Sequence, residues 1–340
     1  MKYGSGYAIT GVHGKILLIL MLTLSLCSLP VSAVTITDDA GTTITLNTTP
    51  QRIVSLSPSN TEILADIGLL DRVVGVTDVC DYPPEVKNKT RVGGYSAISI
   101  EKVAATKPDL VIASDKTSGE TVSRLREIGF PVIVVAPKNV DHVMRDIRML
   151  GNITGMEIQA GDLEARLTRR IDAASTPQKT SSPTVAHVVY NKPLYVSGSV
   201  TLQDDIITRA GGTNVFAGRN GWGTVSLEEF LLANPDIIIV SSGGGMDPSG
   251  RDVILGEFME NQHYASLSAV KNRHVYAVNA DIISRPGPRV ADAAEEVSRI
   301  IRTVEEEQTA PLPSGTAKTP GFTPIPALLA LLIIIARSGE

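Results

Sequence analysis

Two short segments of the chain place an aromatic residue and a glutamate at the same spacing. Tyr95 precedes Glu101 by six residues, and Trp222 precedes Glu228 by six residues. An aromatic ring can cover the apolar surface of a ligand, and an exposed carboxylate can dock onto the basic groups of a partner. The matched spacing therefore predicts two equivalent parts of a binding surface rather than a centre for covalent chemistry.

The similarity between the two segments extends beyond these four residues. Both contain two spacers after the aromatic residue, then Ile or Val, Ser, an apolar residue and Glu, and both continue to a Pro-Asp pair that opens an apolar strand, at 108–109 and 235–236. A repeat of this length indicates two similar α/β lobes with a pseudo-twofold relation. We expect the lobes to close on something that lies between them.

The two glutamates are predicted to lie in the first turn of equivalent helices. Ser99 is the expected N-cap of one helix, and Ser226 forms a capping box with Glu229 in the other. The helix dipole favours carboxylates at these positions, which would explain one glutamate by itself. Because Glu101 and Glu228 are matched on both lobes, we favour a shared docking role on one exposed face.

The two aromatic residues are predicted to lie on loops before those helices. Trp222 is the only tryptophan and is flanked by Gly221 and Gly223, a setting that suits a ring presented to a ligand. A place in the core is the alternative for both Tyr95 and Trp222.

A third polar group lies near the end of the folded region. Arg285 and Arg289 fall just before or at the start of an amphipathic helix predicted from about Val290 to Val304. The helix dipole opposes positive charge there, so the two guanidinium groups need an acidic partner. That partner is either Asp281 or an anionic group of a ligand.

Enzymatic motifs are missing from the sequence. It contains no phosphate-binding Gly-x4-Gly-Lys-Ser/Thr loop, no His-Glu-x-x-His and no Gly-x-Ser-x-Gly elbow. The histidines show no paired spacing, so we predict no catalytic residue, no resident metal and no cofactor. The glycines at 243–245 either cradle an anion or form a flexible loop at the rim of a cleft. Nothing in the net charge of −5 supports nucleic-acid binding.

The N-terminal residues 1–33 have the form of a secretory signal peptide. Lys15 precedes an apolar run over 16–29, and Val31-Ser-Ala33 is a small-residue cleavage pattern. Lipid attachment at Cys27 is the alternative. If the chain is exported, three glycosylation acceptor sequences, at 47–49, 88–90 and 152–154, become relevant. Removal of the signal peptide would leave Cys80 as the only mature cysteine, which excludes an intrachain disulfide.

The C-terminus has the form of a second targeting signal. A Pro/Ser/Thr-rich linker over 306–324 contains Pro320-Gly-Phe322 and leads to a hydrophobic segment over 325–340. Its roughly a dozen apolar residues are fewer than the ~20 needed to cross a bilayer. The segment resembles the sorting signals that archaeosortase-type enzymes remove from archaeal surface proteins. A plain tail anchor is the alternative, and either would hold the protein on the cell surface.

The folded part is predicted to be an N-terminal lobe over 34–139, a helical strut over 140–182 and a C-terminal lobe over 183–305. Strands and helices alternate in both lobes, which favours Rossmann-like, mainly parallel sheets in an α/β fold. A helix of about 19 residues after Gly155 would span roughly 28 Å and bridge the lobes. Ser59 and Glu62 have the spacing of a capping box at the first helix.

Several motifs together resemble the cobalamin and ferric-siderophore substrate-binding proteins of ABC importers. The similarity covers about 52–303 and is carried by Ser57-Pro-Ser-Asn-Thr-Glu62, Asp81-Tyr-Pro-Pro84, Val92-Gly-Gly94, Glu101 with Lys107-Pro-Asp-Leu-Val111, and Gly287-Pro-Arg289. It implies two α/β lobes bridged by one long helix, with the ligand in the cleft. It also implies that Glu101 and Glu228 dock onto arginine pockets of a membrane permease, which works with an ATPase.

The resemblance also implies a ligand site. The cleft aromatics of the cobalamin binders resemble Tyr95 and Trp222, and their late acidic and basic loop resembles Asp281 and Arg289. Val79 stands where a further aromatic residue is expected, which departs from the cobalamin pattern. A corrinoid or ferric chelate is the expected ligand class, bound by a monomer with little closure. Haem, an oxyanion, or an exported enzyme or cofactor scaffold on the same lobes are the alternatives.

Overall fold

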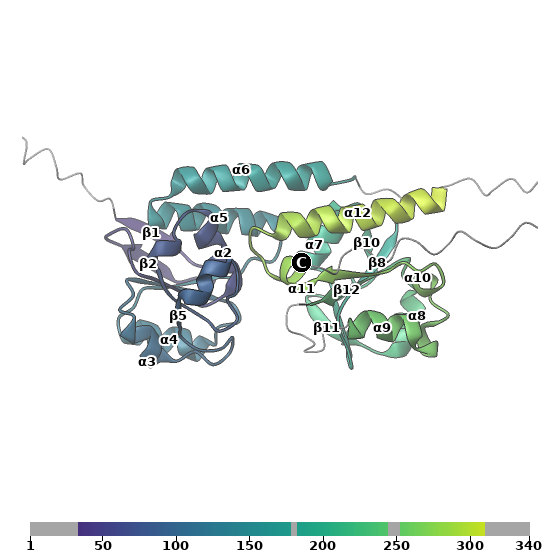
Figure 1. The fold of residues 1–340 in the computed structure, drawn as a ribbon, viewed down its shortest axis with the longest axis horizontal. Helices are drawn as coiled ribbons and strands as arrows, with labels where there is room; N and C mark the ends of the chain where they lie inside the picture. Colours follow the sequence, from purple (N-terminus) through teal and green to yellow (C-terminus); the bar gives the residue numbers. More distant parts are fainter. Residues whose placement is uncertain (1–32, 178–181, 244–251, 310–340) are drawn as a thin grey trace, which may run out of the picture.

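The computed structural model describes residues 33–177, 182–243 and 252–309 as two α/β lobes side by side (Figure 1). The predicted signal peptide, except for its last residue, and the C-terminal segment 325–340 lie outside these ranges, as do most of the predicted linker and Gly244 and Gly245. None of the helices in the described ranges combines the length and apolar character needed to cross a bilayer.

The N-terminal lobe is built on a five-stranded sheet that is parallel throughout, in the order β5-β4-β3-β6-β7. Its central strands are buried apolar runs, as expected for a parallel sheet covered on both faces. A separate antiparallel hairpin, β1 and β2, precedes the sheet. The elements are β1 (Val34–Thr37), β2 (Thr43–Leu46), β3 (Ile53–Ser55), α2 (Pro58–Asp66), β4 (Val73–Val76), β5 (Thr90–Arg91), α3 (Ile100–Ala105), β6 (Leu110–Ser114), α4 (Gly119–Glu127) and β7 (Val132–Val135), with short 3-10 turns at Leu70–Arg72 and Pro84–Asn88.

The connection between the lobes is a pair of packed helices, α5 (Val140–Thr154) and α6 (Glu157–Ala174). Gly155 separates them in a left-handed conformation, with φ +70°, which glycine adopts readily at a helix end. The long helix predicted after Gly155 is therefore confirmed. The start of α5 also contacts the C-terminal lobe, because the Val140 N–H donates to Asp205 at 2.8 Å.

The C-terminal lobe has a mixed sheet in the order β11-β9-β8-β12-β13, with β10 beside β8. Strands β8, β10, β12 and β13 are parallel, whereas β9 and β11 run antiparallel to their neighbours. The elements are β8 (Thr184–Asn191), β9 (Leu194–Ser197), α7 (Leu202–Arg209), β10 (Thr213–Asn214), β11 (Trp222–Val225), α8 (Leu227–Ala233), β12 (Ile237–Ser242), α9 (Val253–Glu260), α10 (Ser268–Lys271), β13 (Val275–Asn279), α11 (Ala280–Ser284) and α12 (Val290–Thr309), with a 3-10 turn at Gln262–Tyr264. Helix α12 thus includes the first residues of the predicted linker.

One apolar core continues from lobe to lobe. It includes Ile63 of α2, Ile147 of α5, Leu167 of α6, Ile206 of α7 and Val297 of α12, all essentially without solvent exposure. Each lobe has a second apolar cluster on the other face of its sheet. The two lobes are therefore joined by packed side chains, and not only by the chain itself.

The Pro-Asp part of the repeat has a structural role in both lobes. Asp109 accepts the backbone N–H groups of Gln51 and Arg52 at 2.7 and 2.8 Å, just before β3. Asp236 accepts both the N–H and the hydroxyl group of Thr184 at 2.9 and 2.7 Å, at the start of β8. Each aspartate thus fixes the beginning of the strand that comes first along the chain in the main sheet of its lobe, β3 or β8.

Candidate functional site

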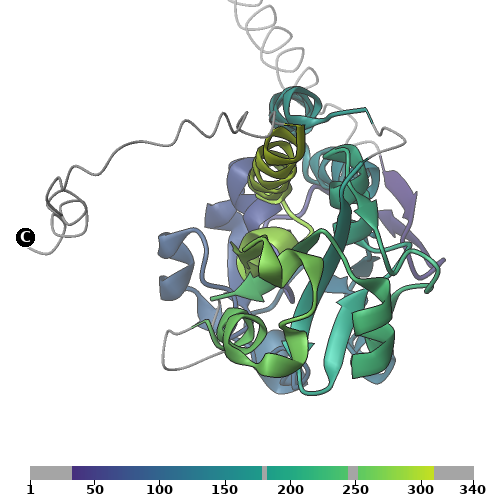
Figure 2. The same cartoon turned by 90° about the vertical axis from the view of Figure 1, so that its right-hand side faces the viewer.

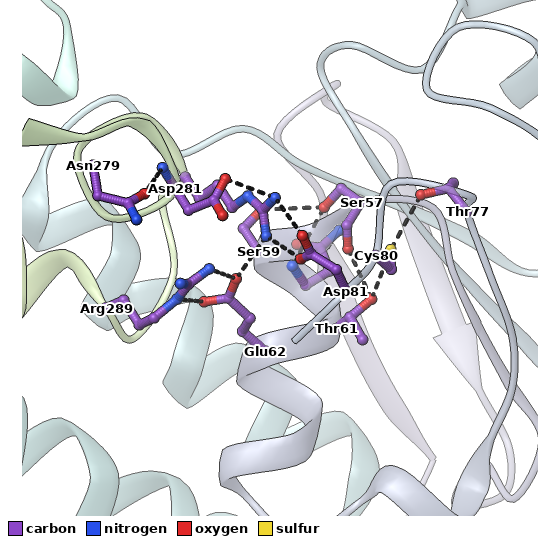
Figure 3. A network of polar contacts seen from close by, with 12 residues as sticks. Ser57, Ser59, Thr61, Glu62, Thr77, Cys80, Asp81, Asn279, Asp281 and Arg289 are labelled. Carbon is purple, nitrogen blue, oxygen red and sulfur yellow. Dashed lines mark hydrogen bonds and ion pairs between the residues drawn. The ribbon is translucent and has the colours of Figure 1, made fainter. Parts of the chain in front are cut away.

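A buried ion pair joins the two lobes where the start of α2 meets the loop before α12 (Figure 3). The Arg289 guanidinium donates to both carboxylate oxygens of Glu62, at 2.9 Å from Nε and 2.6 Å from Nη2. Glu62 is only 1% exposed. The predicted capping box at this helix is wrong, because Ser57 rather than Ser59 is the N-cap and accepts the Asn60 N–H, while the Glu62 side chain pairs with Arg289.

Arg285 extends this pair toward solvent. Its Nη1 group donates to Asp81 at 2.6 Å and lies 3.5 Å from Glu62, and its Nη2 group lies 2.8 Å from Asp281. The two arginines thus have three carboxylate partners, two of which belong to the N-terminal lobe. The sequence predicted the need for an acidic partner but offered only Asp281 or a ligand anion.

The two halves of this network differ in their electrostatics. Burial raises the pKa of Glu62, and the hydrogen bond and charge of Arg289 oppose that rise. The hydrogen bond from Arg285 lowers the pKa of Asp81, which is about half exposed. A buried pair broken on one side leaves an uncompensated charge, whereas an exposed pair can exchange with water or a ligand. The Asp81–Arg285 half is therefore the exchangeable one.

A polar hollow of about 200 Å³ lies at this junction, on the side next to α6. Both lobes line it, with Glu62 and Tyr82 from one and Pro288 and Arg289 from the other, together with Arg166 of α6. The Arg289 guanidinium carbon also lies 4.6 Å from the centre of the Tyr82 ring. Neither Tyr95 nor Trp222 lines this hollow.

Trp222 begins strand β11 and lies on a small aromatic surface of the C-terminal lobe. Its ring stacks on Tyr195 with centroids 5.9 Å apart and planes 6° apart, and meets His187 edge-on at 5.8 Å. The ring remains partly exposed. The predicted loop position is wrong, because β11 pairs with β9 and brings Trp222 opposite Ser197. Tyr195 and His187 were not predicted as neighbours.

His187 beneath Trp222 is fully buried and hydrogen-bonded through both ring nitrogens. Its Nδ1 is 3.2 Å from the Ser197 hydroxyl, and its Nε2 is 3.1 Å from the Ser241 hydroxyl. Burial lowers the pKa of His187 to about 3. The imidazole is therefore neutral at physiological pH and supports the aromatic surface as a fixed polar group.

Tyr95 lies at the tip of a tight loop in the N-terminal lobe. An antiparallel bridge between Gly93 and Ile98 closes the loop, and a Cβ atom at Gly93 would lie 2.4 Å from the Ala97 carbonyl oxygen. Tyr95 is 45% exposed, and burial of its hydroxyl together with the charge of Asp115 raises its pKa. The predicted loop position is confirmed for this residue.

Glu101 and Glu228 occupy matched positions at the starts of α3 and α8. Ser99 and Ser226 are the N-caps and accept the N–H groups of Lys102 and Glu229 at 3.2 and 3.1 Å. Both glutamates are exposed, and hydrogen bonds from their own N–H groups and from the cap serines lower their pKa values. Both helices lie in the lower half of Figure 1, away from α6. Charged carboxylates are thus presented by both lobes.

The structure brings together some predicted residues and separates others. Asp281, Arg285 and Arg289 form one cluster, completed by Glu62 and Asp81 from the resembling motifs. Tyr95 and Trp222 lie in different lobes and make no ring contact with each other. Within the ranges described by the structure, no group of three or more His, Cys, Asp or Glu side chains could hold a metal ion.

Two α/β lobes joined by packed helices, with polar and aromatic groups at and beside their junction, define the class of two-lobed binding proteins. The chain belongs to the periplasmic binding protein family, whose model matches residues 53–282.

Among curated relatives, the chain is 31% identical over 278 residues to the uncharacterized ABC transporter substrate-binding lipoprotein YvrC of Bacillus subtilis, covering 79% of this chain and 85% of YvrC. It is 29% identical over 260 residues to a vitamin B12-binding protein of Vibrio cholerae, covering 76% of this chain and 91% of the relative.

Solved structures show the same similarity. The periplasmic vitamin B12 binding protein BtuF of Vibrio cholerae matches with a TM-score of 0.65 at 28% identity, over 76% of this chain and 98% of BtuF. The periplasmic heme-binding protein RhuT from Roseiflexus matches with a TM-score of 0.64 at 26% identity, over 75% of this chain and 98% of RhuT. The predicted two-lobed α/β fold is confirmed.

Proposed function

We propose that the protein captures a cobalamin-like compound or an iron chelate outside the cytoplasm and delivers it to an ABC permease. The observation that carries this proposal is the aromatic surface of Trp222 and Tyr195 in one lobe with Tyr95 at the equivalent position of the other. Its support is membership of a family whose relatives are named for binding vitamin B12 and heme.

The chemistry of these residues suits a large chelate. A chelator supplies the metal ligands itself, so the protein needs apolar surface and a few polar groups. Trp222, Tyr195 and Tyr95 would supply that surface, and Arg285 with Asp81 would supply polar groups that can exchange partners. Arg289, in contrast, would serve to hold the lobes together, because its guanidinium is committed to a buried carboxylate.

Delivery would depend on Glu101 and Glu228. Each is an exposed carboxylate at a helix start, and together they provide one ionised group on each lobe. Arginine forks on a permease would recognise such groups. On this proposal the protein acts as a monomer, performs no covalent chemistry and is held at the cell surface by its C-terminal segment.

Fluorescence titration of the single tryptophan tests the proposal. Purified protein is titrated with cyanocobalamin, with hemin and with a ferric hydroxamate, and binding is measured in parallel by calorimetry. We expect saturable quenching by one of these chelates with a stoichiometry near one per chain. The Trp222→Phe variant separates loss of signal from loss of binding, because calorimetry still reports the ligand. Absence of saturable binding to all three chelates in both assays would overturn the proposal.

A further inference from the structure

A second hollow, of about 410 Å³, lies between α6 and α12, outside the ligand site proposed above. Four arginines line it, three from α6 and one from α12: Arg166, Arg169, Arg170 and Arg302. Figures 1 and 2 show the two helices side by side along one edge of the molecule. This groove between α6 and α12 concentrates positive charge in a chain whose net charge is −5.

The charges of the four arginines are not equally compensated. Arg170 donates to Glu295 at 2.8 and 2.7 Å and to Asp292 at 2.6 Å. In the described part of the chain, the Arg166 guanidinium has one ion-pair partner, Asp66 at 3.9 Å. Within the same ranges the side chains of Arg169 and Arg302 form no hydrogen bond or ion pair, and both residues are exposed. The groove therefore retains an excess of unpaired guanidinium groups.

The groove is lined by four guanidinium groups and one carboxylate, that of Glu295, and its volume has room for more than one anionic group. Among the described residues, its apolar lining consists of Ala173 and Ala174, whose small side chains leave room between the helices. The carboxylates that hold Arg170 also tie α12 to α6, so the walls are fixed before any ligand arrives. Guanidinium groups bind phosphate and sulfate oxygens through two parallel hydrogen bonds. Arg166 and Arg169 are about one helical turn apart, so successive anionic groups can be met along the groove.

We infer that the groove between α6 and α12 binds the phosphate or sulfate ester groups of an acidic polymer. The choice of a polymer over a membrane surface rests on the proposed function. If α3 and α8 face the permease, α6 lies on the side away from the bilayer (Figure 1). The lining residues within the described ranges are arginines, one glutamate and two alanines, and none has a large apolar side chain that would insert into a lipid headgroup region.

Binding to fluorescein-labelled dextran sulfate, with neutral dextran as the reference, tests this inference. The double variant Arg169→Ala/Arg302→Ala removes the two unpaired guanidinium groups. The matched control Arg124→Ala/Lys271→Ala removes two exposed positive charges from α4 and α10, so both variants have the same net charge. We expect about a tenfold or larger loss of affinity in the groove variant and less than about a twofold loss in the control. The affinity of the unmodified protein should fall as salt rises.

Three results would overturn the inference: equal losses in both double variants, no binding of dextran sulfate at roughly physiological salt, or equally tight binding of polyglutamate or of vesicles containing an anionic phospholipid. The last result would assign the groove to another class of partner. Chelate titration of the same variants should be unchanged, which separates this test from that of the proposed function.

Discussion

The two lobes share one sequence repeat, but they match in structure around its glutamate and differ around its aromatic residue. At the glutamate end the lobes agree, since a serine caps each helix and an exposed carboxylate follows it. At the aromatic end they diverge, because Tyr95 lies in a glycine-closed loop whereas Trp222 begins a strand and stacks on Tyr195. A symmetric outer surface suits a partner with two similar halves, and an asymmetric aromatic surface suits a ligand without such symmetry.

The Pro-Asp end of the repeat has a different explanation. The residues before the prolines, Lys107 and Asn234, both have positive φ, at 48° and 38°. The aspartates that follow hold the starts of β3 and β8, the first strands of the two main sheets along the chain. This part of the repeat is therefore explained by folding, and only the segment from the aromatic residue to the glutamate remains for function.

The strongest test of the symmetric end is the double variant Glu101→Ala/Glu228→Ala. We expect it to abolish uptake of the chelate into cells or permease-containing vesicles, because both docking carboxylates are lost. Each single variant should reduce uptake to a similar degree. Ligand affinity, measured by tryptophan fluorescence, should stay unchanged. A loss of affinity would instead place these residues in the ligand site.

The pH dependence of stability should distinguish a buried histidine of the C-terminal lobe from a buried aspartate on α5. The pKa of His187 in the C-terminal lobe is lowered to about 3, so its contribution to stability is present above its unfolded pKa near 6.5 and is lost as the pH falls toward 3. At about 1.4 kcal/mol per pKa unit, this amounts to at most about 5 kcal/mol.

The contribution of Asp146, on α5, to stability changes with pH in the opposite direction. It is fully buried beside Arg145, and burial raises its pKa to about 7. Its contribution is therefore complete below the unfolded pKa of 3.8 and is lost as the pH rises through 7, by at most about 4 kcal/mol.

Urea unfolding across this pH range measures both effects. Between about pH 4 and 6.5 the two groups partly cancel in the unmodified protein. His187→Gln should reveal a stability that falls with rising pH, and Asp146→Asn one that rises with it. Parallel pH profiles for both variants would contradict these assignments.

The junction between the lobes should respond unequally to loss of its two arginines. Arg289→Ala removes both short hydrogen bonds to the buried Glu62 and leaves it the longer 3.5 Å contact to Arg285, and we expect a loss of about 3–5 kcal/mol in the free energy of unfolding. Arg285→Ala removes the contacts to the half-exposed Asp81 and to Asp281 but leaves Glu62 paired with Arg289, so it should cost less, about 1 kcal/mol.

Chemical denaturation of both variants measures this difference. Adding Glu62→Gln to Arg289→Ala removes the stranded charge and should recover part of the stability. Equal losses for the two arginine variants would mean that the buried and exposed halves of the network do not differ.

The smallest expected difference concerns the aromatic end. Trp222→Ala removes the ring that stacks on Tyr195, whereas Tyr95→Ala removes an exposed ring that has no ring partner among the described residues. We expect a loss of chelate-binding free energy of about 2 kcal/mol for the first and about 1 kcal/mol or less for the second. Calorimetry measures both, with Ile158→Ala in α6 as a control for an exposed apolar side chain. Equal losses would contradict the asymmetry of the two lobes.

The elements that sequence predicted well are those with local causes. The apolar periodicity after Gly155 predicted α6, and the N-cap serines predicted the starts of α3 and α8, whereas the predicted capping box of Ser226 with Glu229 is only half formed because the Glu229 carboxylate pairs with Arg219. Glycines on both sides of Trp222 suggested a loop, yet strand β11 forms because it pairs with β9. That pairing is non-local, so no local sequence pattern predicts it.

Glu62 is a second residue whose role depends on a distant part of the chain and could not be predicted from its local sequence. Its spacing from Ser59 matches a capping box, and the local pattern is satisfied by that interpretation. Its partner Arg289 is 227 residues away in the sequence. Only the meeting of the lobes decides between the cap and the ion pair, so the centre of the junction could not be found from either segment alone.

The continuous apolar core through α5, α6 and α12 has a mechanical consequence for any cargo held between the lobes. Spreading the lobes enough to expose an extra 200 Å² of this core would cost about 5 kcal/mol at roughly 25 cal/mol per Å². At about 1.4 kcal/mol per tenfold, such an opened state would make up roughly one molecule in 5,000, so the lobes should rarely separate without help. Release of a bound molecule would then be helped by a partner that contacts both lobes at once and draws them apart.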